Sequence, residues 1–455
     1  MQHRSDRERG TMVNIDREEI LQNDKPQMVA KKMSQFGGIN ILSQKIREKI
    51  TTENIFKIFN SFIIPLLSHE ERNFMLSLQQ YCVDVLEPKI DLTQDVYALF
   101  PLLGEGGYMQ RLYPYKEYTS FGMRYELILA MCLSILDPEL DLARVVSGVL
   151  AMNPLYSHGK TDTELQALDD LMSGRKIGCI CITERERGSD AVNMQTKVSA
   201  CDDETGDIYY DGEKIFTTNG PVADYFIAYG VDDERNPRGS MYQALVERGF
   251  DGLETHRLGI LSVPRVHIGQ TLFNHVRVPR DNILGDRGEG YKNLFRGLVA
   301  ERNTIIGSSL GISWLSAITG LIYTNHREQF GKRLMEYQAV SFPIAEMLVD
   351  LMAATDLGFS AANEYEKIAR HPEHFDSMVK YNASFSAGTK YMASNLAHRI
   401  SYEMQQLCGG AGYTDNLRID KALEVSKIQE IIGGSRNIQL LLVTQAIKTI
   451  LNLIE

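Results

Sequence analysis

Residues 180–198 read ICITERERGSDAVNMQTKV, and the spacing of apolar residues along the sequence changes at this stretch. Before it, apolar residues recur three or four positions apart, and after it β-prone runs are separated by turn residues. The run KIGCICIT, which leads into the stretch, is typical of a strand. The stretch therefore predicts a junction at which a helical domain ends and a β domain begins.

On the C-terminal side of this junction we predict a β domain over residues 176–283. IYYDGEKIFTT reads as a strand, a turn at Asp211-Gly212 and a second strand. YFIAYGV, YQALVE and TLFNHVRV read as further strands.

Helical sequence is predicted on both sides of the β domain, over residues 67–175 and 284–455. Ser68, followed three positions later by Glu71, is typical of a capping box at the start of a helix. Two apolar stripes predict long antiparallel helices of a bundle. The stripes are Ile344, Met347, Leu348, Leu351, Met352, Thr355 and Phe359, and Ala393, Leu396, Ala397, Ile400, Met404 and Leu407.

Residues 1–66 read as a leader, partly helical or disordered, outside the domains. Its apolar residues suit one or two short amphipathic helices, formed by Met33, Phe36, Ile39, Leu42, Ile46 and Ile50. We expect this leader to be an appendage. The sequence as a whole predicts a mostly α fold with a middle β domain.

Composition excludes several classes of protein. The chain has 455 residues, 44% of them hydrophobic, which suggests a globular protein of about three domains. Its net charge of −11 argues against nucleic-acid binding. No apolar run approaches the roughly 20 residues of a membrane span, and the charged start MQHRSDRERG argues against a signal peptide. We therefore expect a cytoplasmic protein.

The six cysteines are scattered along the chain, as in a protein with reduced thiols. Cys179 and Cys181 would share one face of a strand, and no second pair stands at zinc-like spacing. We predict no metal site.

The stretch at residues 180–198 resembles the flavin-contacting signature of acyl-CoA dehydrogenases, T-E-P-x-x-G-S-D followed after a short spacer by T-x-A or T-x-V. Six residues match: Thr183, Glu184, Gly188, Ser189, Asp190 and Thr196. Arg185, Glu186 and Arg187 replace the usual proline and small residues. Four further segments occur in the order of the family: GEKIFTTNGPVADYF, RVPRDNILGDRGEGY, HREQFGKRLMEYQAVSF and QQLCGGAGYTDNLRIDKALEVSKIQEIIGGSRNIQ. The resemblance covers residues 67–450.

The resemblance implies an N-terminal helical domain, a β-barrel-like middle domain and a C-terminal four-helix bundle, with one FAD per subunit. It implies an oxidoreductase of fatty acid metabolism that converts an acyl-CoA thioester to the enoyl-CoA. It also implies electron transfer to an electron-transfer flavoprotein and a homo-oligomer, either a dimer or a homotetramer.

The same resemblance assigns site residues. Thr183 and Thr218 would donate hydrogen bonds to the flavin, Phe216 would lie against its ring, and Arg327 with Phe330 would reach the cofactor of a neighbouring subunit. The complete cofactor set is Ile182, Thr183, Ser189, Phe216, Thr217, Thr218, Arg327, Phe330, Gln338, Gln406, Gly409, Gly410 and Ser435. The substrate set is Ser189, Arg302 and Gly433. Taken alone, the threonines read more readily as strand formers and the arginines as solvated helix charges.

The catalytic base departs from the common pattern of the family. Most members carry a glutamate where IQEIIGGS places Gly433, which keeps a backbone N–H donor but supplies no base. A subset that includes isovaleryl-CoA and long-chain enzymes places the base earlier, before an arginine, and GLVAERNTIIGSSLG places Glu301 beside Arg302 there. We therefore expect Glu301 to remove the α proton. The alternative is a structural carboxylate. Loss of a side chain at Gly433 is also expected to leave room for a substrate that is bulky near the thioester.

Two other functions remain open at this point. A flavin monooxygenase on the same fold would lack the glutamate at position 433. A catalytically silent flavoprotein or interaction subunit is suggested by Gly433 and by the altered loop of Arg185, Glu186 and Arg187. In that case the leader would be a docking arm; otherwise it is a helix that covers the N-terminal domain.

Overall fold

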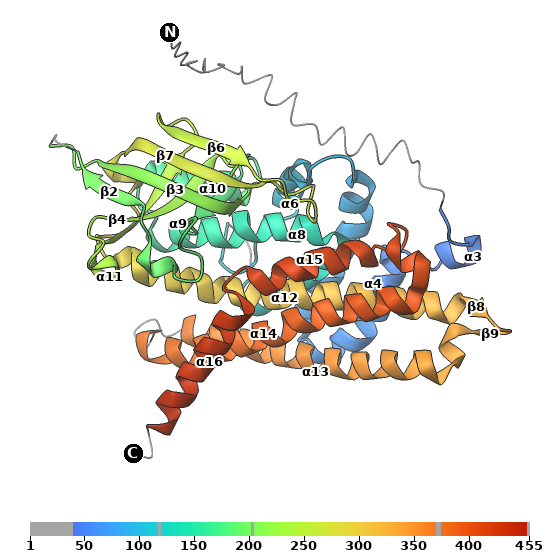
Figure 1. Ribbon diagram of the computed structural model, residues 1–455. Helices are drawn as coiled ribbons and strands as arrows, with labels where there is room; N and C mark the ends of the chain where they lie inside the picture. Colours follow the sequence, from blue (N-terminus) through green and yellow to red (C-terminus); the bar gives the residue numbers. More distant parts are fainter. Residues whose placement is uncertain (1–39, 117–119, 202–203, 370–374, 453–455) are drawn as a thin grey trace, which may run out of the picture.

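The computed structural model describes residues 40–116, 120–201, 204–369 and 375–452, with only the backbone described over 375–383. Met33, Phe36 and Ile39 of the predicted leader helices lie outside this part. The chain forms N-terminal helices, then a β domain, then a bundle of long helices (Figure 1). The predicted order of helical, β and helical parts is confirmed.

The N-terminal part consists of helices of 4 to 14 residues. The capping box is present, because the Glu71 N–H donates to the Ser68 hydroxyl (3.2 Å) and the Ser68 N–H donates to the Glu71 carboxylate (2.8 Å). The helices are α3 (Gln44–Arg47), α4 (Thr52–Ile63), α5 (His69–Tyr81), α6 (Phe100–Glu105), α7 (Met123–Leu136), α8 (Pro138–Val145), α9 (Met152–His158) and α10 (Asp162–Met172).

The expectation that the whole leader is an appendage is wrong for α4. Ile55, Phe59 and Ile63 are fully buried, and the rings of Phe59 and Phe62 lie 5.9 and 4.9 Å from the indole of Trp314. Apolar residues on one face of α4 therefore pack into the same core as the helical bundle.

The β domain is one curled seven-stranded sheet. Its order is β1-β4-β2-β3-β7-β6, with β5 paired to β4. β1 and β4 are parallel, whereas β3 and β7, β4 and β5, and β6 and β7 are antiparallel. The strands are β1 (Gly178–Cys181), β2 (Lys197–Ala200), β3 (Ile208–Thr218), β4 (Tyr225–Val231), β5 (Met241–Glu247), β6 (Leu253–Arg257) and β7 (Ile268–Val278), with the short helix α11 (Pro237–Ser240) before β5.

The hairpin predicted at Asp211-Gly212 is wrong. β3 runs through this dipeptide as one strand, and its pairing with β7 shifts register between Tyr210 and Gly212. At this shift β3 advances two residues, from Tyr210 to Gly212, while β7 advances three, from Val276 to Phe273. The extra residue of the bulge is therefore on β7, and the turn-like dipeptide stays inside a continuous β3.

The C-terminal part is a bundle in which α12 is the central helix. The predicted stripes are largely confirmed: Ile344, Leu351 and Ile400, for example, are fully buried. Met352 is a correction, because it is 50% exposed; it directly follows Leu351 and so points about 100° away from it. The elements are α12 (Glu289–His326), the hairpin β8 (Glu328–Gln329) and β9 (Lys332–Arg333), α13 (Gln338–Ala369), α14 (Phe375–Cys408), α15 (Ile419–Ile431) and α16 (Arg436–Leu451).

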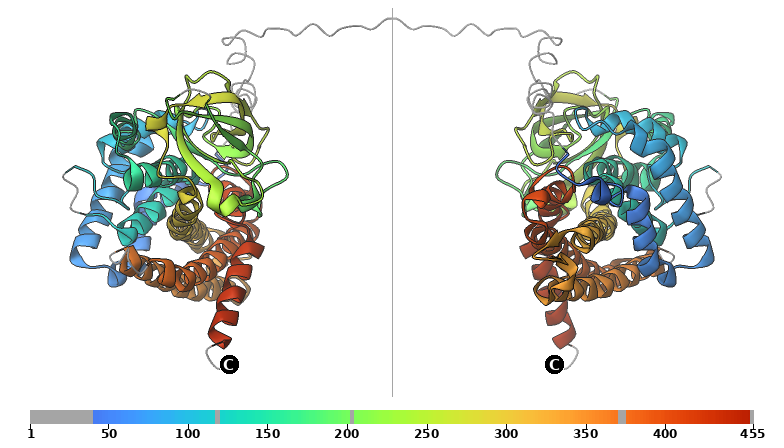
Figure 2. Two further views of the ribbon diagram at one scale, coloured as in Figure 1. Left: turned by 90° about the vertical axis from the view of Figure 1, so that its left-hand side faces the viewer. Right: turned by 90° about the vertical axis from the view of Figure 1, so that its right-hand side faces the viewer.

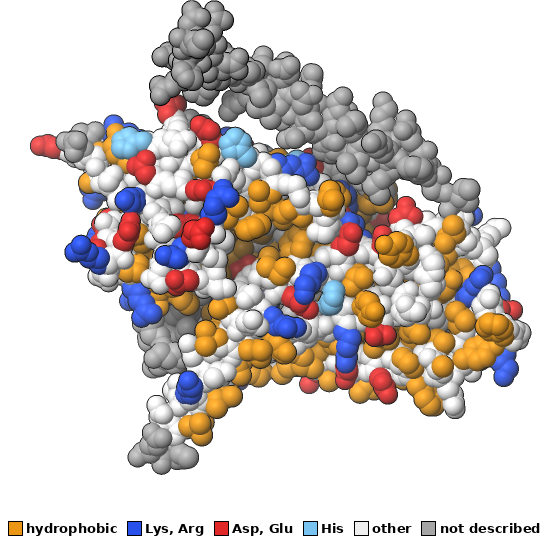
Figure 3. Space-filling view, viewed as in Figure 1, with side chains coloured by type: hydrophobic (Ala, Val, Ile, Leu, Met, Phe, Trp, Pro, Cys, Tyr) orange, Lys and Arg blue, Asp and Glu red, His pale blue; other side chains and the backbone are white. Residues whose placement is uncertain are grey.

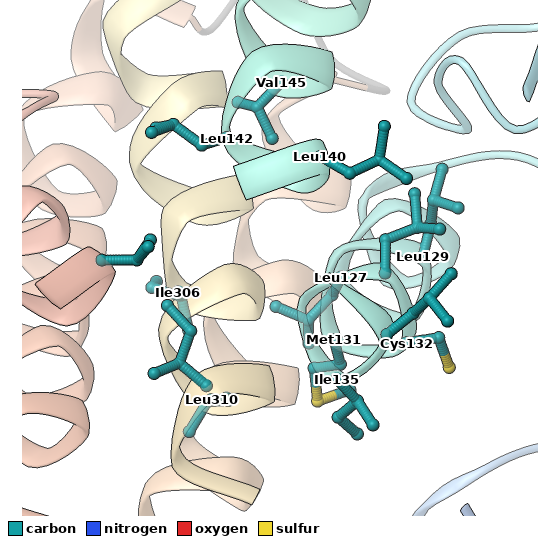
Figure 4. Packing of buried hydrophobic residues seen from close by; sticks show 14 of the residues in the cluster. Leu127, Leu129, Met131, Cys132, Ile135, Leu140, Leu142, Val145, Ile306 and Leu310 are labelled. Atoms are coloured by element: carbon teal, nitrogen blue, oxygen red, sulfur yellow. The ribbon is translucent and has the colours of Figure 1, made fainter. Parts of the chain in front are cut away.

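Two views show how these parts are stacked. The sheet lies on the helical layers, and α16 projects away from the body toward the C-terminus (Figure 2). α7 packs along α12, with Leu127 and Met131 facing Ile306 and Leu310 (Figure 4). α12 is long and apolar enough to cross a membrane, but 94% of its apolar window is buried. That burial is typical of the core helix of a folded domain.

Candidate active site

Glu301 and Gly433 meet at one point in the structure, although they are far apart in sequence. A Cβ built on Gly433 would lie 3.4 Å from the carboxyl carbon of Glu301 and 3.5 Å from its Oε2 atom. Glu301 is on α12 and is almost fully buried. Gly433 lies in the turn between α15 and α16, where its φ angle is +61°. The carboxyl group from the helix therefore stands next to the position that lacks a side chain.

Three buried side chains hold the carbonyl groups of this turn. Arg302 Nε donates to the Gly433 carbonyl (3.2 Å). Gln439 Nε2 donates to the same carbonyl (3.0 Å) and to that of Gly434 (2.6 Å). Lys390 Nζ, from α14, donates to the carbonyls of Gly434 (3.1 Å) and Glu430 (3.3 Å). We call Arg302, Lys390 and Gln439 the carbonyl clamp.

The charges around Glu301 are strongly influenced by burial. Burial raises the pKa of Glu301 to about 7, against the opposing effect of the positive charges on Arg302 and Lys390. Burial lowers the pKa of Arg302 to about 10 and that of Lys390 to about 8. No described residue donates a hydrogen bond to the Glu301 carboxylate. At neutral pH the site therefore holds two buried cations beside a carboxyl group that is partly ionised.

The predicted flavin residues of the β domain also lie together. The Ile215 N–H donates to the carbonyl of Thr183 (2.8 Å), which joins the end of β1 to β3. Ile182 and Thr183 thus lie beside the segment Phe216–Thr218. Phe216 has φ +57 and is 61% exposed at a register shift of β3. An exposed aromatic ring at a strained backbone position fits contact with a flat ligand.

Hydrogen bonds of the buried Glu184 carboxylate fix the loop before β2. Glu184 is buried, and its Oε1 atom accepts from the Thr196 N–H (2.8 Å) and from Lys214 Nζ (2.9 Å). These bonds tie the loop to β2 and β3, and leave Gly188 and Ser189 exposed at its tip. Arg185 at the altered position pairs with Glu213 (2.6 Å) on the surface.

The helix α8 connects the sheet to α12. Asn219, which follows β3, donates to the Ala143 carbonyl (2.9 Å), and Ser308 of α12 donates to Asp141 (2.6 Å). Lys421 of α15 reaches the Ser262 carbonyl in the loop after β6 (3.1 Å). The face between the β domain and α15 is hollowed and rich in hydrophobic side chains (Figure 3).

The remaining predicted residues lie at the opposite end of the bundle. Arg327 directly follows α12, Phe330 is 95% exposed in the β8–β9 hairpin, and Gln338 is the exposed first residue of α13. Gln406 lies in the last turn of α14, and Gly409 and Gly410 directly follow this helix. All three lie close to Arg327, since the four residues line one pocket. The structure thus separates the predicted cofactor residues into two groups. Ser435 belongs to the first group, next to Gly433, as the residue before α16.

Both groups retain features that suit parts of a dinucleotide. No described carboxylate pairs with the Arg327 guanidinium. A Cβ built on Gly409 or Gly410 would meet no atom within 4 Å, so open space remains beside this backbone. A free cation and accessible backbone fit a phosphate group, as Phe216 fits a flat ring.

The expected extra room at Gly433 is absent. A Cβ there would come within 2.7 Å of Ile305 Cδ1, in addition to the Glu301 carboxyl group. The space that a side chain would occupy is therefore filled from α12, and Gly433 gives no support for a bulky substrate.

Two members of the carbonyl clamp were missed in the sequence. Lys390 stands three residues after Ala387 and three before Ala393 in the buried stripe of α14. A lone lysine on an apolar helix face was the available signal. Gln439 lies inside a quoted motif, yet nothing in its spacing indicates that its side chain turns back to Gly433.

The sequence of this chain is similar to known proteins of one family. Residues 179–276 match the middle domain of acyl-CoA dehydrogenases, and residues 288–448 match the C-terminal domain. A short-chain-specific acyl-CoA dehydrogenase from Megasphaera elsdenii is 30% identical over 317 residues, 66% of this chain and 78% of that protein. A mitochondrial isovaleryl-CoA dehydrogenase from Oryza sativa subsp. japonica is 24% identical over 397 residues, 85% of this chain and 93% of that protein.

The fold has counterparts among solved structures. A glutaryl-CoA dehydrogenase from Mycobacterium smegmatis, in complex with FADH2, superposes with a TM-score of 0.75 at 23% identity, covering 84% of this chain and 95% of that one. The predicted fold, enzyme class and FAD cofactor are confirmed at the level of the family. The matched domains, the related sequences and the shared fold together establish that this chain belongs to the acyl-CoA dehydrogenase family.

Proposed function

We propose that this chain removes the α proton of an acyl thioester with Glu301 and yields the α,β-unsaturated thioester. The observation that carries the proposal is the 3.4 Å between the Glu301 carboxyl carbon and the Cβ position of Gly433. A base from α12 is thereby delivered beside the residue at which most of the family carries it. FAD, when bound, supplies the acceptor for the hydride that leaves Cβ.

The environment of Glu301 suits a general base. A base works best when its pKa is near the working pH, because it must be ionised and still accept a proton readily. Burial places the pKa of Glu301 at about 7. Since no described donor is bonded to the carboxylate, its lone pairs are available to a substrate.

The turn at Gly433 supplies the complementary group. Its N–H has no acceptor among the described residues, while its carbonyl is occupied by Arg302 and Gln439. A backbone N–H held in one orientation stabilises the negative charge that develops on a thioester oxygen. We assign this role to the Gly433 N–H and a supporting role to the carbonyl clamp.

We assign the cofactor residues in two groups. Ile182, Thr183, Ser189, Ser435 and the segment Phe216–Thr218 would hold the flavin end. The six residues at the far end, namely Arg327, Phe330, Gln338, Gln406, Gly409 and Gly410, would hold the adenosine diphosphate end. Ser189 and Arg302 would also contact the acyl-CoA. Electrons would then pass to an electron-transfer flavoprotein.

We infer a homo-oligomer from the distance between the two groups. Glu301 and Arg327 are 26 residues apart on or directly after α12, so they are separated by about 39 Å along the helix. A single cofactor spans the two groups only when they come from different copies. Exposed apolar residues on α16 support association; they are Leu440, Leu441, Ile447, Ile450 and Leu451. The number of copies, dimer or tetramer, and a cytoplasmic location stay predictions.

The test is anaerobic bleaching of the oxidised flavin by a panel of acyl-CoA thioesters. Wild type should bleach with at least one thioester, and Glu301→Gln should bleach about 10²–10⁴-fold more slowly. Glu346→Gln, on the exposed face of α13, is the matched control. Equal rates for wild type and Glu301→Gln would refute the base assignment.

Absence of bleaching with every thioester would instead favour the other two functions. Oxygen-dependent turnover of another substrate would then indicate a flavin monooxygenase. A flavin that binds but never reacts would indicate an interaction subunit.

A further inference from the structure

The leader forms one wall of a pocket at the far end of the bundle. The pocket has a volume of about 460 Å³ and lies between residues 41–46, the end of α12, the β8–β9 hairpin and residues 406–411. It includes Arg327, Gln406, Gly409 and Gly410, which are four of the residues assigned above to the adenosine diphosphate end of FAD. The leader therefore meets the proposed cofactor site directly.

This wall is fixed in place. Leu42 and Ile46 are buried, so they anchor the segment in the core. The Ile41 N–H donates to Asn416 Oδ1 (3.0 Å), and Lys45 pairs with Glu328 of the hairpin (3.8 Å). The segment is thus bonded to the hairpin that flanks the pocket and to the turn before α15.

The groups that this wall presents are suitable for a nucleotide. Ser43 lines the pocket and caps α3 without a hydrogen bond from its hydroxyl. Ile41 also lines the pocket and remains 54% exposed. Opposite them stand the guanidinium of Arg327 and the open backbone of Gly409 and Gly410. A hydroxyl, a cation and an exposed apolar side chain match a ribose, a pyrophosphate and an adenine ring.

We propose that residues 41–46 bind the adenosine diphosphate end of an FAD whose flavin lies in the β-domain site of a second copy of the chain. The inference rests on the proposed function for the identity of the cofactor. The separation of about 39 Å between Glu301 and Arg327 is the reason that the second copy is required. The leader is then a part of the cofactor site and not only a cover of the helical core.

The first test compares two neighbouring residues of the leader. Ser43→Trp places a bulky ring into the pocket, whereas Gln44→Trp is the control, since Gln44 is exposed and lies outside the pocket. FAD release from each holoenzyme is followed by the fluorescence of free flavin after dilution. We expect at least a tenfold weaker affinity for Ser43→Trp and an unchanged affinity for Gln44→Trp, with equal circular dichroism. Equal affinities for the two variants would overturn the proposal.

A second pair tests the chemistry of the pocket. Ile41→Asp introduces a negative charge into the pocket proposed for the negatively charged adenosine diphosphate, and Ile41→Asn introduces a side chain of similar size without that charge. We expect Ile41→Asp to bind FAD several-fold more weakly than Ile41→Asn at low salt, with the difference decreasing in 1 M salt. Equal binding at low salt would overturn the placement of the adenosine diphosphate in this pocket.

A mixed oligomer tests whether the pocket serves the other copy. Chains carrying Ser43→Trp and chains carrying Glu301→Gln are given different tags, produced together and purified through both tags. If the pocket acts on the other copy, the intact Glu301 of one chain is combined with the intact pocket of the other. Part of the bound flavin then bleaches with an acyl-CoA that bleaches wild type. No bleaching in the mixed oligomer would overturn the assignment to a second copy.

These outcomes are separable from failure of the proposed function. If wild type bleaches with no thioester, the dehydrogenase proposal fails. The affinity comparison between Ser43→Trp and Gln44→Trp is still decisive for the leader, because it measures FAD release and not turnover.

Discussion

Replacing Glu301 with glutamine should slow the reaction and also stabilise the folded protein. The two effects have one cause, which is the buried carboxylate. Glu301 is almost fully buried, and burial raises its pKa from 4.5 to about 7. A glutamine of the same size carries no charge to desolvate and loses no hydrogen bond from a described residue. Stability is therefore expected to rise where wild type must keep Glu301 ionised.

The magnitude follows from the two pKa values. A tenfold difference in proton affinity corresponds to about 1.4 kcal/mol, so ionised Glu301 costs the folded state about 3 kcal/mol relative to the unfolded chain. Because the pKa of Glu301 is raised in the folded state, ionisation of Glu301 destabilises the folded protein. Below pH 4.5 the group is protonated in both states and costs nothing. The cost grows as the pH rises toward about 7 and is constant above it.

The assay is urea denaturation of wild type and Glu301→Gln from pH 4.5 to 8.5, at fixed concentrations of protein and FAD. Cofactor binding and subunit association then contribute nearly equally to both proteins. The advantage of Glu301→Gln in unfolding free energy should grow by about 3 kcal/mol between pH 4.5 and 7. Glu346→Gln, whose side chain is exposed, should show no such trend. A constant difference between wild type and Glu301→Gln would refute the claim that Glu301 is desolvated.

Three further outcomes are expected. The rate of flavin bleaching in wild type should rise with pH through about 7 and then level off, because the raised pKa of Glu301 delays formation of the ionised base. Lys390→Met should slow bleaching about tenfold and move this pH profile to higher pH, since the positive charge of Lys390 lowers the pKa of Glu301. Lys390→Arg keeps the positive charge and should therefore keep the wild-type pH profile. Gly433→Glu should destabilise the protein by about 2–4 kcal/mol, measured by urea denaturation, because its Cβ would meet Ile305 at 2.7 Å and φ is +61. For the same reason Gly433→Glu should not restore bleaching to Glu301→Gln.

The order of the domains was predictable because periodicity is a local property. The change from helical to β spacing near residue 180 and the return near 284 need no knowledge of tertiary contacts. The hairpin at Asp211-Gly212 was wrong because a turn-like dipeptide can also lie in a continuous strand opposite a bulge, and pairing with β7 decides between the two. The burial of α4 depends on Trp314, about 250 residues away in sequence, and no local pattern reports it.

The candidate site was predictable only in part for the same reason. Glu301 and Gly433 were both identified by their motifs, but nothing in the sequence says that they meet. Lys390 and Gln439 act on backbone carbonyls of another element. Such bonds depend on where the backbone carbonyl lies in the fold. Every residue has a backbone carbonyl, so the type of the acceptor residue does not reveal the bond.

The position of the proposed base on α12 gives the carbonyl clamp a role in the proposed mechanism. Gly433 and Gly434 both have positive φ and no side chain to restrict them, so this turn alone would hold its N–H loosely. Glu301 is fixed by the core helix α12 and does not depend on the turn. Arg302 follows Glu301 on that helix and donates to the Gly433 carbonyl, so it links the base to the donor through one side chain. We therefore expect a movement of α12 to carry Glu301 and the turn together, so that the distance between the proposed base and the proposed oxyanion donor is kept.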